Sequence, residues 1–384
     1  MTDAPAHAPH IAPTHEAAPR RPPEALEALP SAQGRLWRPR RVLITRAARE
    51  WPMAARVAER AAALGAEVVE LKGDRLTGLS DGETPAQAYR SAKGTLAVTV
   101  ASPSARRPQP IPPSADWRFD LATGCPAHCQ YCYLAGSLSG PPVTRLFANL
   151  PEILAELPPL VGQGRVTSAS AARRGEGTTF EASCYTDPLG IEHLCGALSE
   201  TVAHFGAWEA EVQLRFTTKF ADVAGLCAIE HRGRTRARFS VNAEAITRRF
   251  EGGTAPLAAR LAAMGEMARA GYPVGLTVAP IMPIEGWAEA YDDLIRDAAA
   301  ALPEGADVTA ELITHRFTPG SKEVLLGWYP ATGLEMDEAV RTVKRNKFGG
   351  RKYVYPKELM AEMREALEGA LARHLPGARV LYWT

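Results

Sequence analysis

The segment Gly124–Tyr133, GCPAHCQYCY, carries three cysteines directly after a short stretch that is typical of a β-strand, Trp117–Leu121. Cys125, Cys129 and Cys132 follow the spacing C-x3-C-x2-C. Thiolates bind soft metals, and cysteine is the usual ligand of iron–sulfur clusters. Three thiolates leave one iron of a [4Fe–4S] cube without a protein ligand, so a small molecule can bind there. The segment therefore predicts a [4Fe–4S] cluster that takes part in chemistry.

Two other sites use the same kind of residue. A structural zinc ion takes four ligands. His128 would be the fourth, but it is adjacent to Cys129 and poorly placed to share the ion, and no second cysteine pair follows at zinc-ribbon distance. A redox pair of Cys129 and Cys132 would leave Cys125 without a role. The cluster is the interpretation that accounts for all three thiols.

The composition excludes several classes of protein. The chain has 384 residues, of which 46% are hydrophobic and 23% charged, as in an ordinary globular protein. Its 44 basic and 43 acidic residues give a net charge of +1, so the whole molecule does not attract nucleic acid or an anionic membrane. No apolar run is long enough to span a bilayer, and the N-terminus does not resemble a signal peptide. These features predict a cytoplasmic protein without a membrane partner.

Three segments differ in composition. Residues 1–38 are rich in proline and alanine, which predicts a disordered tail. Residues 39–113 contain a strand, a helix and a second strand at Arg41–Thr45, Trp51–Gly65 and Glu67–Leu71, followed by a linker. They predict a small α/β unit with a β-α-β start. Residues 114–384 form the predicted main domain.

Strands and helices alternate along the main domain. The predicted strands are Trp117–Leu121, Arg165–Ala169, Thr178–Cys184, Val212–Thr218, Arg236–Asn242, Val274–Ala279 and Val308–Ile313. A helix at Lys357–His374 and a strand at Arg379–Tyr382 end the chain. Such alternation is typical of parallel βα units, and this number of units predicts an α/β fold with a partial (β/α) TIM-type barrel. Active sites in these barrels lie at the carboxyl ends of the strands.

The cysteine spacing resembles that of the radical S-adenosylmethionine (SAM) superfamily. The resemblance implies that SAM binds the free iron through its amino and carboxylate groups. The reduced cluster would then cleave SAM to methionine and a 5′-deoxyadenosyl radical. It also implies a reducing electron donor such as flavodoxin or ferredoxin.

A closer resemblance covers residues 117–384. The segments that resemble the spore photoproduct lyase family are Cys129–Leu134, Phe180–Cys184, Leu214–Lys219, Arg238–Asn242, Glu311–Phe317 and Lys352–Tyr355. The resemblance implies a lyase that repairs a UV-induced thymine dimer, the spore photoproduct, in DNA. The radical removes a hydrogen from the lesion, the bond between the thymines breaks, and a cysteine returns a hydrogen atom. Tyrosines near the cluster then help to re-form SAM.

The resemblance also implies roles for single residues. Cys184 matches the hydrogen donor, although a buried, inert cysteine is the alternative. Tyr133 and Tyr131 match the tyrosine relay, with Tyr133 favoured, unless they are packing residues. Five residues match positions around SAM: Thr186, Lys219, Ser240, Asn242 and Ala279. The family tends to carry serine at Thr186, and Lys219 could instead be a solvated surface charge.

Two basic segments, His231–Arg238 and Arg341–Lys352, are candidates for contacts with damaged DNA. Within the second segment Lys347, Phe348 and Lys352 match the substrate-binding part of the family, with Lys347 and Phe348 where the family carries arginine and tyrosine. Two alternatives stay open at this point. One is a radical SAM enzyme with another substrate, and the other is a non-catalytic iron–sulfur protein that binds DNA or senses redox state.

Overall fold

The computed structural model describes residues 36–79, 84–137, 142–345 and 349–384. The predicted tail, except for its last three residues, lies outside this part of the chain, and so do Lys347 and Phe348. No helix in the described part is both long enough and apolar enough to cross a membrane.

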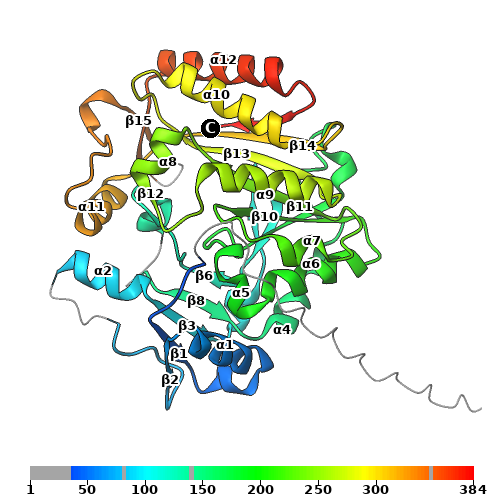
Figure 1. Cartoon of the computed structure of the whole chain (residues 1–384), viewed down its shortest axis with the longest axis vertical. Helices are drawn as coiled ribbons and strands as arrows, with labels where there is room; N and C mark the ends of the chain where they lie inside the picture. The colour runs from blue at the N-terminus through cyan, green and yellow to red at the C-terminus, as the bar shows by residue number, and fades with distance from the viewer. Residues whose placement is uncertain (1–35, 80–83, 138–141, 346–348) are drawn as a thin grey trace, which may run out of the picture. The chain divides into compact units, whose positions relative to one another are not determined.

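The N-terminal unit is built on a five-stranded sheet with the order β2-β1-β3-β8-β6 (Figure 1). Its strands are β1 (Arg41–Ile44), β2 (Glu67–Glu70), β3 (Thr95–Thr99), β6 (Ala122–Thr123) and β8 (Thr144–Phe147). The helices of this part are η1 (Ala47–Glu50), α1 (Pro52–Ala63), α2 (Pro85–Lys93) and α3 (Pro103–Arg106). Only β6 runs antiparallel to its neighbour. The sheet therefore includes two strands, β6 and β8, that flank the cysteine segment and come from the predicted main domain.

The main domain is an eight-stranded sheet with the order β17-β14-β13-β11-β10-β9-β5-β4. Its strands are β4 (Gln109–Ile111), β5 (Ala115–Phe119), β9 (Thr178–Ala182), β10 (Val212–Thr218), β11 (Thr235–Val241), β13 (Val274–Ile281), β14 (Val308–Thr314) and β17 (Arg379–Trp383). All neighbours are parallel except β4 and β5. Strands β4 and β17 are the two edges of this curled sheet and do not pair with each other, so the described residues form an open barrel. This confirms the predicted partial barrel.

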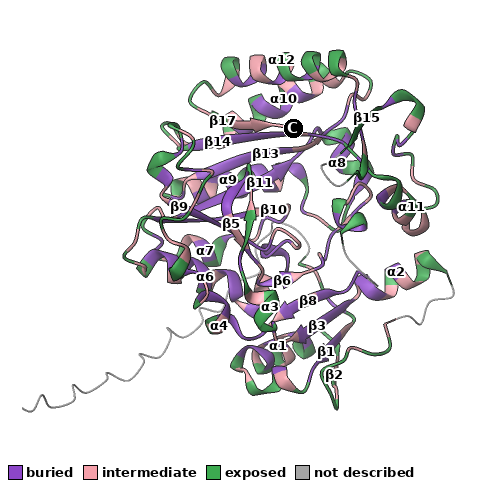
Figure 2. Cartoon of the chain, turned by 180° about the vertical axis from the view of Figure 1, so that it is seen from behind, coloured by how far each residue is buried: buried purple, intermediate pink, exposed green. Residues whose placement is uncertain are grey.

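The remaining helices mostly follow barrel strands, except for α4, which follows β8, and α12, which follows the last two-stranded pair. They are α4 (Leu150–Leu154), α5 (Glu192–Cys195), α6 (Ala197–Ala207), α7 (Ala224–Cys227), α8 (Glu244–Phe250), α9 (Leu257–Arg269), α10 (Trp287–Ala301), α11 (Pro319–Trp328) and α12 (Lys357–His374). Short 3-10 turns lie at η2 (Tyr133–Gly136), η3 (Pro158–Leu160), η4 (Arg174–Glu176), η5 (Leu189–Ile191) and η6 (Glu338–Val340). Strand β11 is buried along its whole length, as Figure 2 shows for the central strands. Burial of each large apolar side chain contributes roughly 1.5–3 kcal/mol, so Phe239 and Val241 of β11 stabilise the centre of the sheet.

Two small pairs of strands complete the fold. Strand β7 (His128–Cys129) pairs antiparallel with β12 (Glu251–Gly252), which follows α8. Strands β15 (Thr342–Arg345) and β16 (Arg351–Val354) form an antiparallel hairpin. All four residues of β15 are exposed.

The predicted strand at Arg165–Ala169 is wrong, because this segment forms turns. The cause is the buried carboxylate of Asp116, which accepts the backbone N–H groups of Val166 at 2.7 Å and Thr167 at 3.2 Å. These donors are no longer available to a neighbouring strand. A single acidic residue from β5 therefore overrides the apolar pattern of the segment.

Candidate functional site

The cysteine segment forms a loop between β6 and η2. Gly124, directly before the first cysteine, has a φ of +75°, and a Cβ there would lie 2.2 Å from the carbonyl oxygen of Val143. Only glycine fits this turn. On the other side of the loop, Gln130 N–H donates to the carbonyl oxygen of Phe250 at 2.8 Å. The loop is therefore fixed at both ends by backbone contacts.

All three cysteines of the loop are free thiols that act on one another electrostatically. Burial raises the pKa of Cys125 to about 12, and the neighbouring Cys132 thiol adds to this shift. Burial also raises the pKa of Cys129, so these two thiols need a positive centre to become thiolates, and bound iron would supply that charge. The residues present therefore fit an iron–sulfur cluster.

The structure gives no support to a single-ion site. Within the described residues, no group of three His, Cys, Asp or Glu side chains is placed to hold one metal ion. A zinc ion gathers its ligands around one point, whereas each thiolate of a cube binds a different iron. Burial lowers the pKa of His128 to about 4, and its ring lies edge-on to Tyr89 at a centroid distance of 5.8 Å. His128 thus packs against the N-terminal unit.

Tyr131 belongs to a buried network of charged groups. Its hydroxyl donates to the Glu251 carboxylate, and Lys219 Nζ lies 3.1 Å from the same hydroxyl and 2.9 Å from Glu251 Oε1. Arg260 binds the other carboxylate oxygen at 2.6 Å. Burial raises the pKa of Tyr131 well above its usual range. The phenol is therefore held protonated beside a lysine at the cluster loop.

Tyr133 connects the cluster loop to the barrel strand β9. Its hydroxyl donates to the backbone carbonyl of Cys184. The side chain is otherwise open, with 61% of the residue exposed. Tyr133 therefore connects the cluster loop to Cys184, whereas Tyr131 contacts Lys219.

Cys184 follows the carboxyl end of β9 and is half-buried. The residue before it, Ser183, has a φ of +58°, which is strained for a non-glycine residue. Ser183 is held there because its Oγ accepts the N–H of Leu121 at 2.8 Å. Burial, together with the carboxylates of Asp120 and Glu181, raises the pKa of the Cys184 thiol to about 12. The thiol therefore keeps its hydrogen at neutral pH.

The five predicted SAM residues lie at or after the carboxyl ends of β9, β10, β11 and β13. The Thr186 hydroxyl is buried without a hydrogen-bond partner among the described residues. Lys219 Nζ lies 3.4 Å from the carbonyl oxygen of Ala279. Asn242 is fully buried and its amide donates to the carbonyl oxygen of Pro280 at 2.6 Å.

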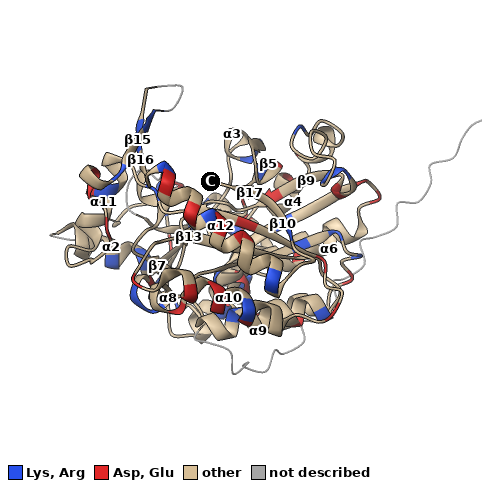
Figure 3. Cartoon of the chain, turned by 90° about the horizontal axis from the view of Figure 1, so that it is seen from above, with Lys and Arg blue, Asp and Glu red and all other residues tan. Residues whose placement is uncertain are grey.

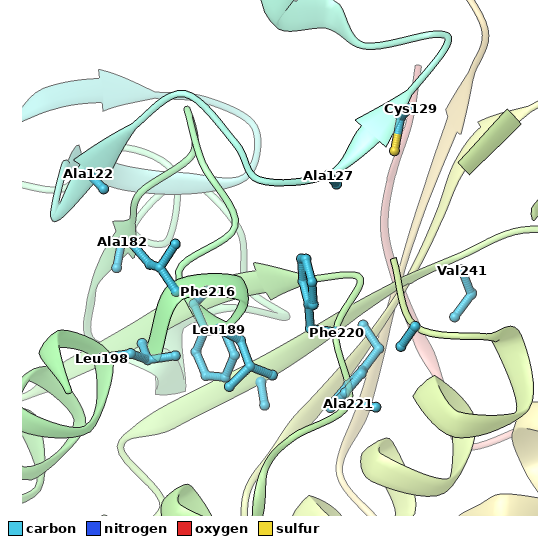
Figure 4. Close-up of a cluster of buried hydrophobic side chains, with 14 of the residues drawn as sticks. Ala122, Ala127, Cys129, Ala182, Leu189, Leu198, Phe216, Phe220, Ala221 and Val241 are labelled. Atoms are coloured by element: carbon cyan, nitrogen blue, oxygen red, sulfur yellow. The ribbon is translucent and has the colours of Figure 1, made fainter. Parts of the chain in front are cut away.

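Ser240 is buried in β11, and its carbonyl oxygen accepts a bond from Arg260 at 3.0 Å. Arg260 also binds Glu251, so Ser240, Lys219 and Tyr131 contact one connected network. Figure 4 shows Cys129 on its strand above the apolar side chains of Phe220 and Val241, which belong to the same hydrophobic cluster.

Some residues of the site were not expected from the sequence. Glu251 and Arg260 were missed, because Glu251 reaches the loop through the pairing of β7 with β12, and Arg260 of α9 reaches it through its ion pair with Glu251. Arg118 and Asp120 were missed as well. Their signal was present, since two charges of opposite sign flank an apolar residue at the end of a predicted strand next to the cysteines.

Two of the four arginines of the first basic segment are buried, so their side chains are not available to DNA. Arg236 is buried and pairs with Asp307 at 2.9 Å, while Arg238 is buried and pairs with Glu311 at 2.9 Å. In the second segment, Arg341 is buried against the Tyr355 ring. Arg236 and Arg238 therefore make contacts within the barrel, and Arg341 packs beside the β15–β16 hairpin.

In the β15–β16 hairpin, marked by Lys and Arg positions in Figure 3, the side chains of Lys344, Arg345 and Arg351 are exposed. Its described basic residues are Lys344, Arg345, Arg351 and Lys352. Lys352 is the one that is partly buried, and burial together with the nearby Arg316 lowers its pKa. A lysine with a partly desolvated ammonium group gains more from a phosphate than a fully hydrated one.

Comparisons with known proteins agree with this geometry. The family model for spore photoproduct lyase matches residues 37–384. The chain belongs to the spore photoproduct lyase family. It is 38% identical to the spore photoproduct lyase of Bacillus subtilis (strain 168), over 90% of this chain and 98% of the relative. It is 37% identical to that of Geobacillus sp. (strain Y412MC61), with the same coverage of both chains.

Solved structures of the family are similar along nearly the whole chain. A spore photoproduct lyase complexed with dinucleoside spore photoproduct matches with a TM-score of 0.82 and 36% identity, over 91% of this chain and 100% of that chain. A mutant of spore photoproduct lyase with bound AdoMet and dinucleoside spore photoproduct matches equally well. The similarity includes the N-terminal unit and the barrel.

Proposed function

We propose that this protein is a radical SAM lyase that repairs the spore photoproduct in DNA. The observation that carries the proposal is the placement of Cys184. A protonated thiol lies at the carboxyl edge of the barrel and is bound through its backbone to Tyr133 of the cluster loop. Membership of the spore photoproduct lyase family and the full-length structural match support it.

Cys125, Cys129 and Cys132 would hold the [4Fe–4S] cluster. When bound together with SAM, the cluster supplies the 5′-deoxyadenosyl radical that removes a hydrogen from the lesion. Lys219, whose ammonium group is buried beside Tyr131, would bind the SAM carboxylate. Hydroxyl and backbone groups of the barrel edge would hold the rest of SAM; these belong to Thr186, Ser240, Asn242 and Ala279. The unpartnered hydroxyl of Thr186 supports this assignment.

Cys184 would return the hydrogen atom. Its S–H bond breaks, a C–H bond forms on the thymine, and the sulfur keeps one unpaired electron. Tyr133, whose hydroxyl reaches the backbone of Cys184, would pass a hydrogen atom next, followed by Tyr131. This order follows the positions of the two phenols, because Tyr131 lies on the far side with Lys219 and Glu251.

Damaged DNA would lie against the β15–β16 hairpin, whose basic side chains are exposed. Lys352 would contact a phosphate, and Lys347 and Phe348, outside the described residues, would contact the lesion. The electron that starts the reaction would come from a reduced protein such as flavodoxin or ferredoxin.

An anaerobic assay tests the proposal. The protein is reconstituted with iron and sulfide, reduced, and mixed with SAM and a synthetic spore-photoproduct dinucleotide. Repaired thymidylyl-thymidine together with 5′-deoxyadenosine is the expected result. Deoxyadenosine without repair would move the substrate elsewhere. Neither product, from protein with an intact cluster, would contradict an enzymatic role altogether.

A further inference from the structure

Helix α2 packs its buried face against the cluster loop. This face carries Tyr89, Ala92 and Lys93. The Lys93 ammonium group donates to the carbonyl oxygen of Cys125, and the Tyr89 ring lies edge-on to His128 at a centroid distance of 5.8 Å. The helix therefore contacts the loop at the first cysteine and again next to the second.

The opposite face of α2 lines an open hollow of about 610 Å³. Arg90 and, one turn earlier, Gln87 line it from the helix, while Arg40 and Arg41 line it from the start of β1. Glu67 is the one acidic residue among the described residues of the lining. The hollow therefore carries an excess of positive charge.

The three guanidinium groups keep their charge unpaired within the described chain. Arg40 Nη2 donates to the backbone carbonyl oxygen of Arg90 at 2.8 Å. Arg41 Nη2 and Arg90 Nε also donate to backbone carbonyl oxygens, at 2.9 Å and 3.3 Å. These acceptors are neutral, and none of the three side chains forms an ion pair with a carboxylate of the described residues. Because the whole chain has a net charge of only +1, the hollow is a local patch that attracts an acidic partner.

Direct contacts link the hollow to the cluster loop. The N–H of Arg40 donates to the carbonyl oxygen of Gly94 at 2.8 Å, and Gly94 directly follows Lys93. Lys93 then reaches the carbonyl oxygen of Cys125. An α-helix with its side chains is about 10–12 Å across. An electron that enters at the hollow therefore crosses roughly one helix diameter to reach the loop.

The other sides of the loop have different partners. Tyr131 contacts Glu251 and Lys219 on the barrel side, and the Tyr133 hydroxyl donates to the backbone of Cys184. Under the proposed function these sides face SAM and the lesion, and the β15–β16 hairpin faces DNA. The α2 side is the one on which a further protein can approach the loop without displacing them.

We propose that the hollow lined by Arg40, Arg41 and Arg90 is the docking site of an acidic electron-transfer protein. The docked donor loses a single electron and the oxidised cluster gains it, and no bond forms or breaks. The inference rests on the proposed function, because that function requires a cluster that is reduced before SAM is cleaved. Charges of opposite sign steer the two proteins together, and salt screens this attraction.

The first experiment measures the Kd of an acidic flavodoxin for the anaerobic holoenzyme, by isothermal titration calorimetry at low ionic strength. The double variant Arg40→Glu/Arg90→Glu should raise the Kd about tenfold or more, because it reverses charges that attract the donor. The variant Arg40→Lys/Arg90→Lys keeps these charges and should bind like the wild type. Added salt should weaken the wild-type complex more than that of the charge-reversed variant.

The second experiment compares repair of the dinucleotide with two reductants. Dithionite is a small molecule that needs no docking surface, so the rate with dithionite should be the same in Arg40→Glu/Arg90→Glu and the wild type. With flavodoxin, NADPH and flavodoxin reductase, the variant should need about tenfold more flavodoxin for its half-maximal rate. Iron content shows that each protein carries its cluster.

Arg46→Glu is the matched control. Arg46 is exposed and lies after β1 at the opposite, carboxyl edge of the same sheet. Reversal of this charge should change neither the Kd of flavodoxin nor the rate that flavodoxin supports. A general effect of net charge would change both.

An unchanged Kd in Arg40→Glu/Arg90→Glu would overturn the inference, and so would an equal change in Arg46→Glu. Loss of dithionite-driven repair of the lesion within a longer oligonucleotide would also overturn it, because the hollow would then bind DNA. Failure of the wild type to repair the dinucleotide with dithionite would contradict the proposed function instead. The flavodoxin titration does not depend on repair, so the two failures are distinguishable.

Discussion

The N-terminal sheet and the barrel both contact the cluster loop, but they contact different parts of it. On the side of the N-terminal sheet, β6 pairs with β8, and the Lys93 ammonium group donates to the carbonyl oxygen of Cys125. On the barrel side, the Tyr131 hydroxyl and Lys219 meet at the carboxylate of Glu251. The first set of contacts binds backbone, and the second joins side chains that can react or bind. The N-terminal sheet therefore positions the loop, while the barrel positions it and, under the proposed function, would supply the groups that bind SAM and transfer hydrogen.

We expect the largest loss of activity when a cysteine ligand is removed, because neither the N-terminal sheet nor the barrel can then keep the cluster in the loop. Cys129→Ala removes a ligand from the strand that pairs with β12. Iron content should fall to background and SAM cleavage should stop. Cys195→Ala is the control, because this free cysteine is buried in α5 with its thiol bonded to Ile191. Retention of a catalytic cluster by the Cys129 variant would contradict the ligand assignment.

The barrel side can be disturbed without touching a ligand. Glu251→Gln leaves the buried charges of Lys219 and Arg260 without their partner. Removal of one member of a buried ion pair costs about 3–5 kcal/mol of stability. Urea unfolding should show this loss, and SAM affinity should fall with it because Lys219 is released.

The matched control for that variant is Glu244→Gln. Glu244 pairs with Arg248 at 3.7 Å on the surface of α8, with its side chain 55% exposed. An exposed pair contributes less than about 1 kcal/mol. Equal losses of stability in the two variants would show that the Glu251 network contributes no more than an exposed ion pair.

The N-terminal side should show the smallest effect. Lys93→Met keeps the length of a buried side chain but removes the bond to the Cys125 carbonyl. A hydrogen bond from a charged group contributes about 1.5–3 kcal/mol. Iron should be lost faster to a chelator, while deoxyadenosine formed per bound cluster stays unchanged. Lys72→Met, at an exposed position, is the control. A fall in deoxyadenosine formed per bound cluster in Lys93→Met would contradict a purely positioning role of this contact.

The sequence predicted the parts of this arrangement that are local. The cysteine spacing, the strand that leads to Cys184 and the final helix follow from neighbouring residues, and the partial barrel follows from their alternation. The partners of Tyr131 could not be predicted, because Glu251 reaches it only through the short β7–β12 pairing. The membership of β6 and β8 in the N-terminal sheet depends on contacts between distant segments, as does the buried state of Arg236.

The most direct test of the central claim uses hydrogen isotopes. Repair of the spore-photoproduct dinucleotide is run in D2O, where the Cys184 thiol exchanges its hydrogen for deuterium. We expect one deuterium in the repaired thymine of the wild type, and loss of clean, labelled product in Cys184→Ala with SAM cleavage retained. Unlabelled repair at equal rates in both proteins would contradict the claim that Cys184 at the barrel edge returns the hydrogen atom.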